Sequence, residues 1–482
     1  MYRDLNEYLS ALEERNLLTR IVDQVNPHLE ICAVTDLECK SANGGQAFLF
    51  ENPTGYDIPV ATNLFGSMER MCMVLGVKCL DDIAKEIAEL IEPRTPSGLV
   101  DVLKLLPSVS RLKDLMPKVV RTAPCQEVVK QNGTLDEIPI LQCWPDDGGR
   151  YITYPLVITK DPETGVRNLG VYRMQVFDGR TTAMHWQRHK GGAQHYRVAE
   201  KRGERLEVAV ALSPDPVLAY SATAPVPEGL DELMLAGLLS RRRVEVVKCI
   251  TVDLEVPASA QIVLEGYVNP GERRSEGPFG DHTGFYSLKD DFPVFHVQCI
   301  TYRKHPIYLT TVVGIPPMED YYLGKASERI FLPLIRKTLP EIVDMHFPAE
   351  GIFHNLVIVS IDKRYPGHAR KIMNAFWGLG QLMFSKTIVV VDQDVDVQNL
   401  SEVAWIVGTH IDPKRDIQFT EGPVDDLENA SPRPAFGSKM GIDATRKWAS
   451  EGFIREWPRR LVTTEAAGQQ AIQILKRLNR NI

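Results

Sequence analysis

The sequence predicts a mixed α/β protein built from more than one domain, and three observations lead to this expectation. The chain has 482 residues, which is more than one hydrophobic core ordinarily organises. Apolar residues make up 44% of it and charged residues 24%, the balance of a folded globular protein. The hydrophobic periodicity also changes twice, from mixed to strand-rich and then to alternating buried strands and helices.

The first 115 residues form the predicted N-terminal α/β region. Leu5, Tyr8, Leu9 and Leu12 fall on one face of an amphipathic helix. Two short strands are expected, and a long helical segment follows them; the segments are residues 47–50, 59–62 and 68–91.

The central region, residues 116–315, has the two-residue period of β-strands. Phe295, Val297 and Cys299 alternate with His296 and Gln298. Further strands are expected at 244–247, 262–264 and 307–310, and a single helix is expected at about 228–239. Many strands with few helices predict a β-barrel or a β-sandwich.

The last region, residues 316–482, predicts a C-terminal α/β domain. Two buried-strand runs alternate with two helical segments; in chain order the four are residues 356–359, 368–383, 387–391 and 399–407. This order implies a parallel sheet covered by helices. The tail is expected to begin near Pro432, to end in a helix and to pack on a neighbouring subunit.

Composition excludes several classes of protein. The net charge of −8 gives no general attraction to nucleic acid. The eight cysteines include no C-x-x-C pair, so neither a zinc knuckle nor a redox dithiol is indicated. No run of 18 apolar residues and no signal peptide is visible, and the predicted location is the cytoplasm.

Two segments carry candidate chemistry. Residues 276–284 place Glu276 and Asp281 around a Gly-Pro turn, and paired carboxylates can divide the roles of ionised group and acid. A polar hairpin loop explains the same segment equally well. His189, Lys190 and Gly191 precede a helix-like stretch and could seat a phosphate, although a histidine there is more often a simple hydrogen-bonding group.

Read together, these segments and several others resemble the UbiD family of decarboxylases, in particular its quinone-pathway members. The resemblance covers almost the whole chain. Its markers are Ala123-Pro124-Cys125-Gln126, Ile140-Leu141-Gln142-Cys143-Trp144-Pro145, Asn168-Leu169-Gly170-Val171-Tyr172-Arg173, Glu276-Gly277-Pro278-Phe279-Gly280-Asp281-His282-Thr283-Gly284 and Gly437-Ser438-Lys439-Met440-Gly441.

The resemblance implies a central flavin-binding split β-barrel between the N-terminal region and the C-terminal α/β domain. It implies prenylated FMN as cofactor, supplied by a separate flavin prenyltransferase, together with Mn²⁺ or Mg²⁺ and K⁺. It also implies a dimer or hexamer in which the C-terminal segment reaches across subunits. The implied reaction is the reversible, non-oxidative decarboxylation of an aromatic or conjugated acid. The closest likeness indicates a 4-hydroxybenzoate-type acid of quinone biosynthesis, and a polyprenylated substrate would place the enzyme at a membrane surface.

By the same resemblance, Arg173, Glu276 and Asp281 form the catalytic set, with Asp281 as proton donor. We expect Glu276 to be ionised and paired with Arg173, which leaves the proton on Asp281. Asn168, His189 and Glu232 are the implied metal ligands, and the K⁺ would lie on backbone oxygens from Ser221 to Ala224. The implied flavin contacts are Val171, Tyr172, Arg173, His185, Trp186, Gln187, Lys190 and Gly191.

Two other functions fit parts of the pattern. An FMN-dependent oxidoreductase could use a split barrel, but it needs a hydride donor, and Gly378-Leu379-Gly380 lacks the third glycine of a dinucleotide fingerprint. A non-catalytic scaffold of a quinone-biosynthesis assembly would have no use for Arg173 with two carboxylates. The decarboxylase is therefore the preferred hypothesis.

Overall fold

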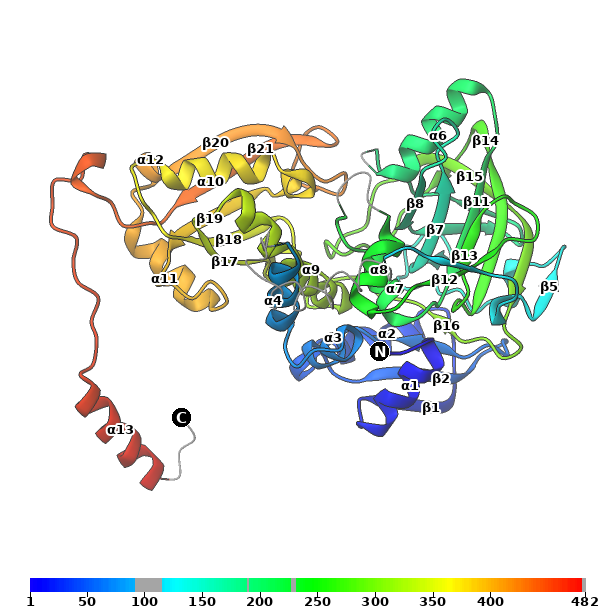
Figure 1. Ribbon diagram of the computed structural model, residues 1–482, viewed down its shortest axis with the longest axis horizontal. Helices are drawn as coiled ribbons and strands as arrows, with labels where there is room; N and C mark the ends of the chain where they lie inside the picture. Colours follow the sequence, from blue (N-terminus) through cyan, green and yellow to red (C-terminus); the bar gives the residue numbers. More distant parts are fainter. Residues whose placement is uncertain (92–114, 189, 227–230, 479–482) are drawn as a thin grey trace, which may run out of the picture.

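The computed structural model describes residues 1–91, 115–188, 190–226 and 231–478. Figure 1 shows a strand-rich unit on the right, an α/β unit on the left and the N-terminal region below, with helix α9 (Glu319–Thr338) between the two large units. This is the mixed α/β, multidomain architecture that the sequence predicts.

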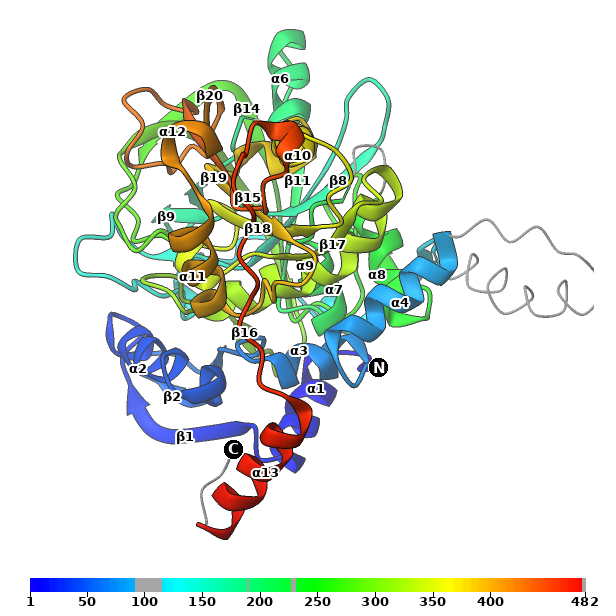
Figure 2. The ribbon, with the colours of Figure 1, turned by 90° about the vertical axis from the view of Figure 1, so that its left-hand side faces the viewer.

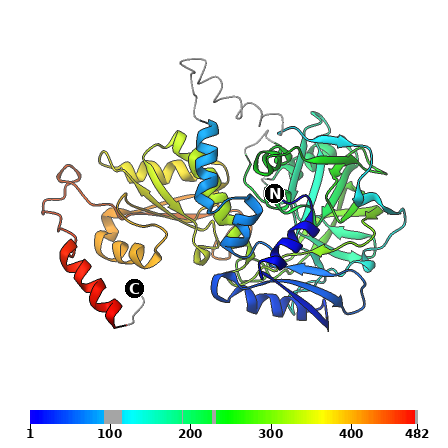
Figure 3. The ribbon, with the colours of Figure 1, turned by 60° about the horizontal axis from the view of Figure 1, so that its bottom comes forward.

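The N-terminal region is a four-stranded sheet flanked by helices, as Figure 3 shows from below. The strands, in sheet order, are β1 (Leu18–Val25), β2 (Ala47–Pro53), β3 (Val60–Thr62) and β16 (Tyr308–Leu309). The helices are α1 (Leu5–Glu14), α2 (Glu30–Cys39), η1 (Ala42–Gly44), α3 (Met68–Leu75) and α4 (Leu80–Ile91). The strand expected at 307–310 thus joins this sheet, parallel to β3, and not a sheet of the central region.

The prediction of one helix over residues 68–91 is wrong, because the chain breaks at Gly76. This glycine has φ 64°, a left-handed conformation that favours glycine, and its backbone N–H closes the end of α3. Helix α4 then begins at Leu80 and packs against α9.

The central region is a nine-stranded antiparallel sheet that curls into a barrel-like shape (Figure 1). In sheet order its strands are β6 (Tyr151–Ile152), β9 (Met174–Asp178), β10 (Thr181–Ala183), β15 (Asp290–Tyr302), β14 (Ile262–Glu276), β11 (Leu206–Leu212), β7 (Pro155–Lys160) and β8 (Arg167–Val171), and β5 (Val128–Lys130) pairs with β15. Alternating residues such as Phe295 and Val297 point into its core, as predicted.

Smaller elements surround this sheet. They are η3 (Pro124–Gln126), η4 (Leu135–Glu137), α6 (Gly191–Arg202), α7 (Pro216–Ser221), α8 (Glu232–Ser240) and a small sheet of β13 (Glu255–Pro257), β12 (Glu245–Lys248) and β4 (Lys118–Val120). The helix expected from residue 228 is described from Glu232, because Asp231 caps it: its carboxylate accepts from the N–H of Leu233. Residues 228–230 lie outside the described part of the chain.

The C-terminal unit is a five-stranded sheet covered by helices. In sheet order the strands are β17 (Ile342–His346), β18 (Leu356–Ile361), β19 (Thr387–Asp392), β21 (Phe436–Asp443) and β20 (Ile417–Pro423). The remaining elements are η5 (Ala349–Gly351), α10 (His368–Trp377), η6 (Gly380–Phe384), α11 (Leu400–His410), α12 (Pro413–Asp416), η7 (Ala449–Glu451) and α13 (Glu465–Arg477). Strands β18 and β19 are parallel, as the β-α-β-α order predicts, and β21 is parallel to β19. The edge strands β17 and β20 are antiparallel to their neighbours, so the sheet is mixed and not purely parallel.

The predicted start of the tail near Pro432 is wrong. Strand β21 lies after Pro432 and fills the position between β19 and β20, so this segment belongs to the core of the sheet. The tail begins after η7, and Leu461 and Val462 within it are 98% and 84% exposed. Figures 1 and 2 show that α13 lies at the far end of an extended segment.

Each unit has its own buried apolar cluster, and further apolar residues fill the junctions between them. Tyr322, Leu323 and Ile330 of α9, for example, pack with the N-terminal helices. Helix α9 therefore links the units through a shared core. Within the described ranges, no helix combines the length and apolarity needed to cross a membrane.

Candidate active site

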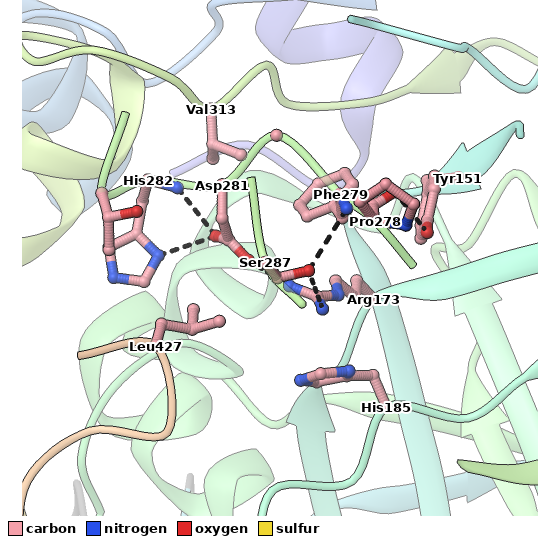
Figure 4. A network of polar contacts seen from close by, with 12 residues as sticks. Tyr151, Arg173, His185, Pro278, Phe279, Asp281, His282, Ser287, Val313 and Leu427 are labelled. Atoms are coloured by element: carbon pink, nitrogen blue, oxygen red, sulfur yellow. Dashed lines mark hydrogen bonds and ion pairs between the residues drawn. The ribbon is translucent and has the colours of Figure 1, made fainter. Parts of the chain in front are cut away.

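Three strand ends of the central sheet and one loop bring the predicted catalytic residues together. Arg173 lies between β8 and β9, His185 follows β10, Glu276 ends β14, and Asp281 lies in the loop after it. Figure 4 shows Arg173, Asp281 and His185 facing one space. The loop turns at Gly277, whose φ of 101° favours glycine.

Arg173 is the centre of a buried ion cluster. Its Nε donates to Glu276 Oε1 at 2.9 Å and one terminal nitrogen donates to Oε2 at 3.2 Å, a bidentate pair. The same terminal nitrogen also donates to Ser287 Oγ at 3.2 Å, and the other terminal nitrogen pairs with Asp281. The side chain of Glu276 is fully buried and those of Arg173 and Asp281 are 8% exposed. These buried charges are therefore stabilised by pairing with one another and not by hydration.

Glu276 is held in its ionised form. Burial alone would raise the pKa of its carboxyl, but the hydrogen bond from His185 and the charge of Arg173 outweigh burial and lower it. His185 Nδ1 lies 3.1 Å from Glu276 Oε2. Burial and the nearby Arg173 lower the pKa of His185, so its ring is neutral at pH 7.

The prediction that Asp281 keeps a proton while Arg173 pairs only with Glu276 is wrong for this structure. Burial would raise the pKa of Asp281, but Arg173 and the hydrogen bonds from His282 hold it well below its usual range. Burial lowers the pKa of His282, yet the hydrogen bond to Asp281 and its charge raise it to about 9. His282 Nδ1 lies 2.8 Å from Asp281 Oδ1, so the proton belongs to the histidine.

The loop between β14 and β15, which carries Asp281, rests on residues to which the sequence assigned no role. Asp147 Oδ1 accepts from Gly280 N at 2.7 Å, and its Oδ2 accepts from the N–H groups of Cys143 and Trp144 at 3.1 and 2.8 Å. A Cβ on Gly280 would lie 2.1 Å from the Trp144 ring, so only glycine fits there. The Cys143-Trp144-Pro145 marker indicated that this segment matters, but only the fold shows that Trp144 packs against Gly280.

The helix expected after Lys190 is present as α6, so Lys190 and Gly191 of the predicted phosphate seat lie at a helix N-terminus. Lys190 precedes this helix, and burial lowers the pKa of its ammonium group. The buried Trp186 Nε1 has no hydrogen-bond partner in the described part of the chain, and a Cβ on Gly192 would lie 2.5 Å from it. An unpaired indole N–H, helix N–H groups and a cation suit a phosphate.

Two of the three predicted metal ligands, Asn168 and Glu232, are among the described residues, and each has a contact close to this seat or to its neighbouring strand β8. Leu169 N, next to Asn168, donates to Glu232 Oε2 at 3.2 Å. A Cβ on Gly191 would lie 2.1 Å from Asn168 Oδ1, which brings this amide against the start of α6. Burial raises the pKa of Glu232 to about 7, the behaviour of a carboxylate without a close cation. His189 lies outside the described residues, so the set of three metal ligands stays a prediction. Among the described residues, no three His, Cys, Asp or Glu side chains are grouped so that they could hold a metal ion.

Of the other predicted flavin residues, Tyr172 and Gln187 have contacts at the start of α6. Tyr172 is buried, and its hydroxyl stands 3.2 Å from Asn168 Nδ2 and 3.5 Å from Gly192 N. Val171 ends β8, and the carbonyl of Gln187 accepts from Lys190 N at 3.0 Å. Ser221 ends α7, and the carbonyls of Ser221 and Ala224 accept from the N–H groups of Ala224 and Val226 at 3.3 and 2.8 Å, so the K⁺ assignment stays a prediction.

Relatives of known sequence or structure resemble the chain over nearly its whole length. A protein of Archaeoglobus fulgidus described as uncharacterized is 53% identical over 462 residues, which cover 95% of this chain and 94% of that one. The vanillic acid decarboxylase of Sedimentibacter hydroxybenzoicus is similar in its closed form (TM-score 0.85, 30% identity, all of both chains). Its open form gives a TM-score of 0.79 at 28% identity, over 100% and 99% of the chains.

An evolved dimeric form of the UbiD-class enzyme HmfF from Pelotomaculum thermopropionicum, in complex with prFMN, is also similar. Its TM-score is 0.78 at 28% identity, over 97% of this chain and 98% of that one. Three family models match in order: the N-terminal, Rift-related and C-terminal domains of UbiD, 3-octaprenyl-4-hydroxybenzoate carboxy-lyase, at residues 9–91, 118–316 and 321–444. The chain therefore belongs to the UbiD family of decarboxylases.

Proposed function

We propose that the protein catalyses the reversible, non-oxidative decarboxylation of a hydroxylated benzoic acid, with prenylated FMN as cofactor. The observation that carries this proposal is the buried cluster in which Arg173 is held between Glu276 and Asp281. An oxidoreductase on the same barrel has no need for a second buried carboxylate paired with a charged histidine.

The substrate class rests on relatives. Vanillic acid, the substrate in the name of the 30% identical decarboxylase, is a 4-hydroxylated benzoic acid. The matching family models carry the name of a 4-hydroxybenzoate carboxy-lyase. We assign a 4-hydroxybenzoate-type acid of quinone biosynthesis to this chain, and a cytoplasmic location with access to the membrane surface if the acid carries a polyprenyl chain.

Lys190, Gly191 and Trp186 would hold the flavin phosphate, and His185 and Arg173 would contact the flavin ring system. A flavin prenyltransferase would supply the cofactor. When bound, prenylated FMN offers an electrophilic centre that accepts the electron pair left by the departing CO₂. Glu276 fixes the guanidinium of Arg173, and this guanidinium positions the substrate by binding its negatively charged carboxylate.

Asp281 is the proposed proton donor, although it is ionised here. A substrate carboxylate beside Arg173 would compete for the guanidinium and so raise the pKa of Asp281. Asp281 could then take the Nδ1 proton of His282 and pass it to the ring carbon that loses CO₂. One proton enters the product for each CO₂ released.

The first experiment tests cofactor and reaction together. Protein co-expressed with a flavin prenyltransferase should release CO₂ from 4-hydroxybenzoate-type acids, and protein made with ordinary FMN should be nearly inactive. The measurement is CO₂ release by each preparation across a panel of benzoic acids, with NADPH oxidation monitored alongside. Equal activity of both preparations contradicts the cofactor assignment, and NADPH-dependent flavin reduction without CO₂ release favours the oxidoreductase.

We further propose that Asn168, His189 and Glu232 hold Mn²⁺ or Mg²⁺ and that carbonyls at 221–224 hold K⁺. Amide, imidazole and carboxylate ligands suit Mn²⁺, and a phosphate oxygen could complete the shell. The half-buried Glu232 carboxylate supports this, because a divalent ion would offset the cost of its burial.

Glu232→Ala should lose both metal and flavin, because the ion would link the protein to the phosphate. Loss of a direct ligand should weaken metal binding by about 100-fold or more. Metal analysis and flavin absorbance of purified protein measure both. Glu204→Ala, which changes an exposed carboxylate paired with Arg202, is the matched control. Full flavin occupancy in metal-free Glu232→Ala protein refutes the link.

For assembly we propose a homo-oligomer, a dimer or a hexamer. The tail supports this: Ile454, Leu461 and Val462 are 98%, 98% and 84% exposed, and Ile472 and Ile474 of α13 are about half exposed. Such a row of apolar side chains is costly in water and suits a protein surface. The HmfF relative is described as a dimeric form.

A further inference from the structure

A pair of histidines connects the active site to the C-terminal unit. His282 follows Asp281 in the loop between β14 and β15, and His354 lies between η5 and β18. Their Nε2 atoms are 3.2 Å apart, and the rings meet edge to face with centroids 5.4 Å apart. His282 lies in a loop of the barrel and His354 in a turn of the C-terminal unit, so this contact exists only where the two units meet.

The backbone before His354 adopts a costly conformation. Ile352 and Phe353 have φ 46° and 49°, a left-handed region that a β-branched residue rarely enters. Phe353 packs against α9, where a Cβ on Gly324 would lie 2.9 Å from its own Cβ. Its ring also lies 5.4 Å from that of His282. The strained turn, held by α9, thus places His354 on His282.

The hydrogen-bond directions at His282 are fixed by its neighbours. Asp281 is a carboxylate, so His282 Nδ1 must donate to it. When His282 is charged, its Nε2 is also a donor, and His354 Nε2 is the acceptor it meets. Burial lowers the pKa of His354 to about 4, which keeps its ring neutral and able to accept. Asp320 and Asp425 raise the pKa of His282, and Lys190 lowers that of His354.

We propose that His354 is a positioning residue that pins the Nε2 proton of His282, so that the proton His282 releases is the one facing Asp281. This rests on the proposed role of Asp281 and adds the group that orients its proton source. In the transfer, the His282 Nδ1–H bond breaks and an Asp281 Oδ–H bond forms. His282 regains its proton from water after product leaves.

Two further observations place this step at the meeting of the two units. The structure is more similar to the closed form of vanillic acid decarboxylase than to its open form, with TM-scores of 0.85 and 0.79. A cleft of about 810 Å³ adjoins the contact, lined by Thr283 next to His282 and by Ile352 near His354. The contact that orients the proton source therefore forms where the two units meet, beside this cleft.

The test compares His354→Gln, whose amide oxygen can still accept from His282, with His354→Leu, which cannot. His305→Gln, on the exposed barrel surface, is the control. Histidine-selective NMR of the flavin-loaded protein, without substrate, follows the pKa of His282, assigned by its absence in His282→Gln. We expect His354→Leu to lower the pKa of His282 by about one pH unit, because charged His282 loses the acceptor of its Nε2 proton. His354→Gln should keep it near the wild-type value.

The pH dependence of kcat gives the second readout. The alkaline limb should move to lower pH in His354→Leu and stay in place in His354→Gln and His305→Gln. An unchanged pKa of His282 in His354→Leu, or equal shifts in the Leu and Gln variants, overturns the proposal. The NMR titration needs no turnover. If the protein decarboxylates none of the acids, the proposed function is refuted, and the titration still tests the role of His354.

Discussion

Asp281→Asn should retain flavin and metal and lose turnover by about 10² to 10⁴, the usual contribution of general acid catalysis. The amide keeps the shape of the side chain and can still accept from His282, but it cannot carry a proton to the substrate carbon. The measurements are kcat for CO₂ release and the rate at which the product's ring hydrogen exchanges with solvent deuterium. Both should fall together.

Asp146→Asn is the matched control, because Asp146 is exposed one position before the buried Asp147. It should leave kcat unchanged. In the wild type, kcat should fall as the pH rises through about 9, where His282 loses the proton it supplies. If Asp281→Asn keeps the wild-type turnover and exchange rates, the general acid is another group, and Glu276 or His282 would be tested next.

The sequence predicted the elements whose patterns are local. Buried runs such as residues 356–359 and 387–391 became the parallel strands β18 and β19, because β-branched residues with flanking polar turns favour strands. The errors arose where the outcome depended on the conformation of one glycine or on pairing between distant segments. Gly76 ends α3, and β21 reaches the middle of a sheet from a segment that looked like a tail.

The candidate site divides in the same way. The resemblance located Arg173, Glu276 and Asp281, and the structure brings them into one buried cluster. The sequence could not predict which group of the site carries the proton, because this depends on which side chains form hydrogen bonds with one another in the fold. The proton lies on His282 because Arg173 and the hydrogen bonds from His282 lower the pKa of Asp281, while the hydrogen bond to Asp281 and its charge raise the pKa of His282. His354 was also out of reach, since it is 72 residues away from His282 along the chain.

Arg173→Leu should be the most damaging single change, affecting both stability and turnover. It leaves Glu276 fully buried without its cation, and breaking a buried ion pair from one side costs about 3–5 kcal/mol. We expect a clear fall in the midpoint of thermal unfolding, together with loss of CO₂ release. Arg20→Leu is the control, because Arg20 pairs with Glu13 where both side chains are more than 40% exposed, and such pairs contribute about 0–1 kcal/mol.

The pH dependence of this loss has a definite sign. In the wild type the pKa of Glu276 is lowered, so the cluster stabilises the fold above the unfolded pKa and the stabilisation is lost as the pH falls. Without Arg173, burial should raise the same pKa, and the variant should then lose stability as the pH rises. The gap between the two unfolding midpoints should therefore narrow toward about pH 4. Replacing the carboxylates as well, with Glu276→Gln and Asp281→Asn, should restore much of the midpoint. A gap that does not change with pH, or no recovery in the triple variant, would show that Arg173 acts by packing and not by charge.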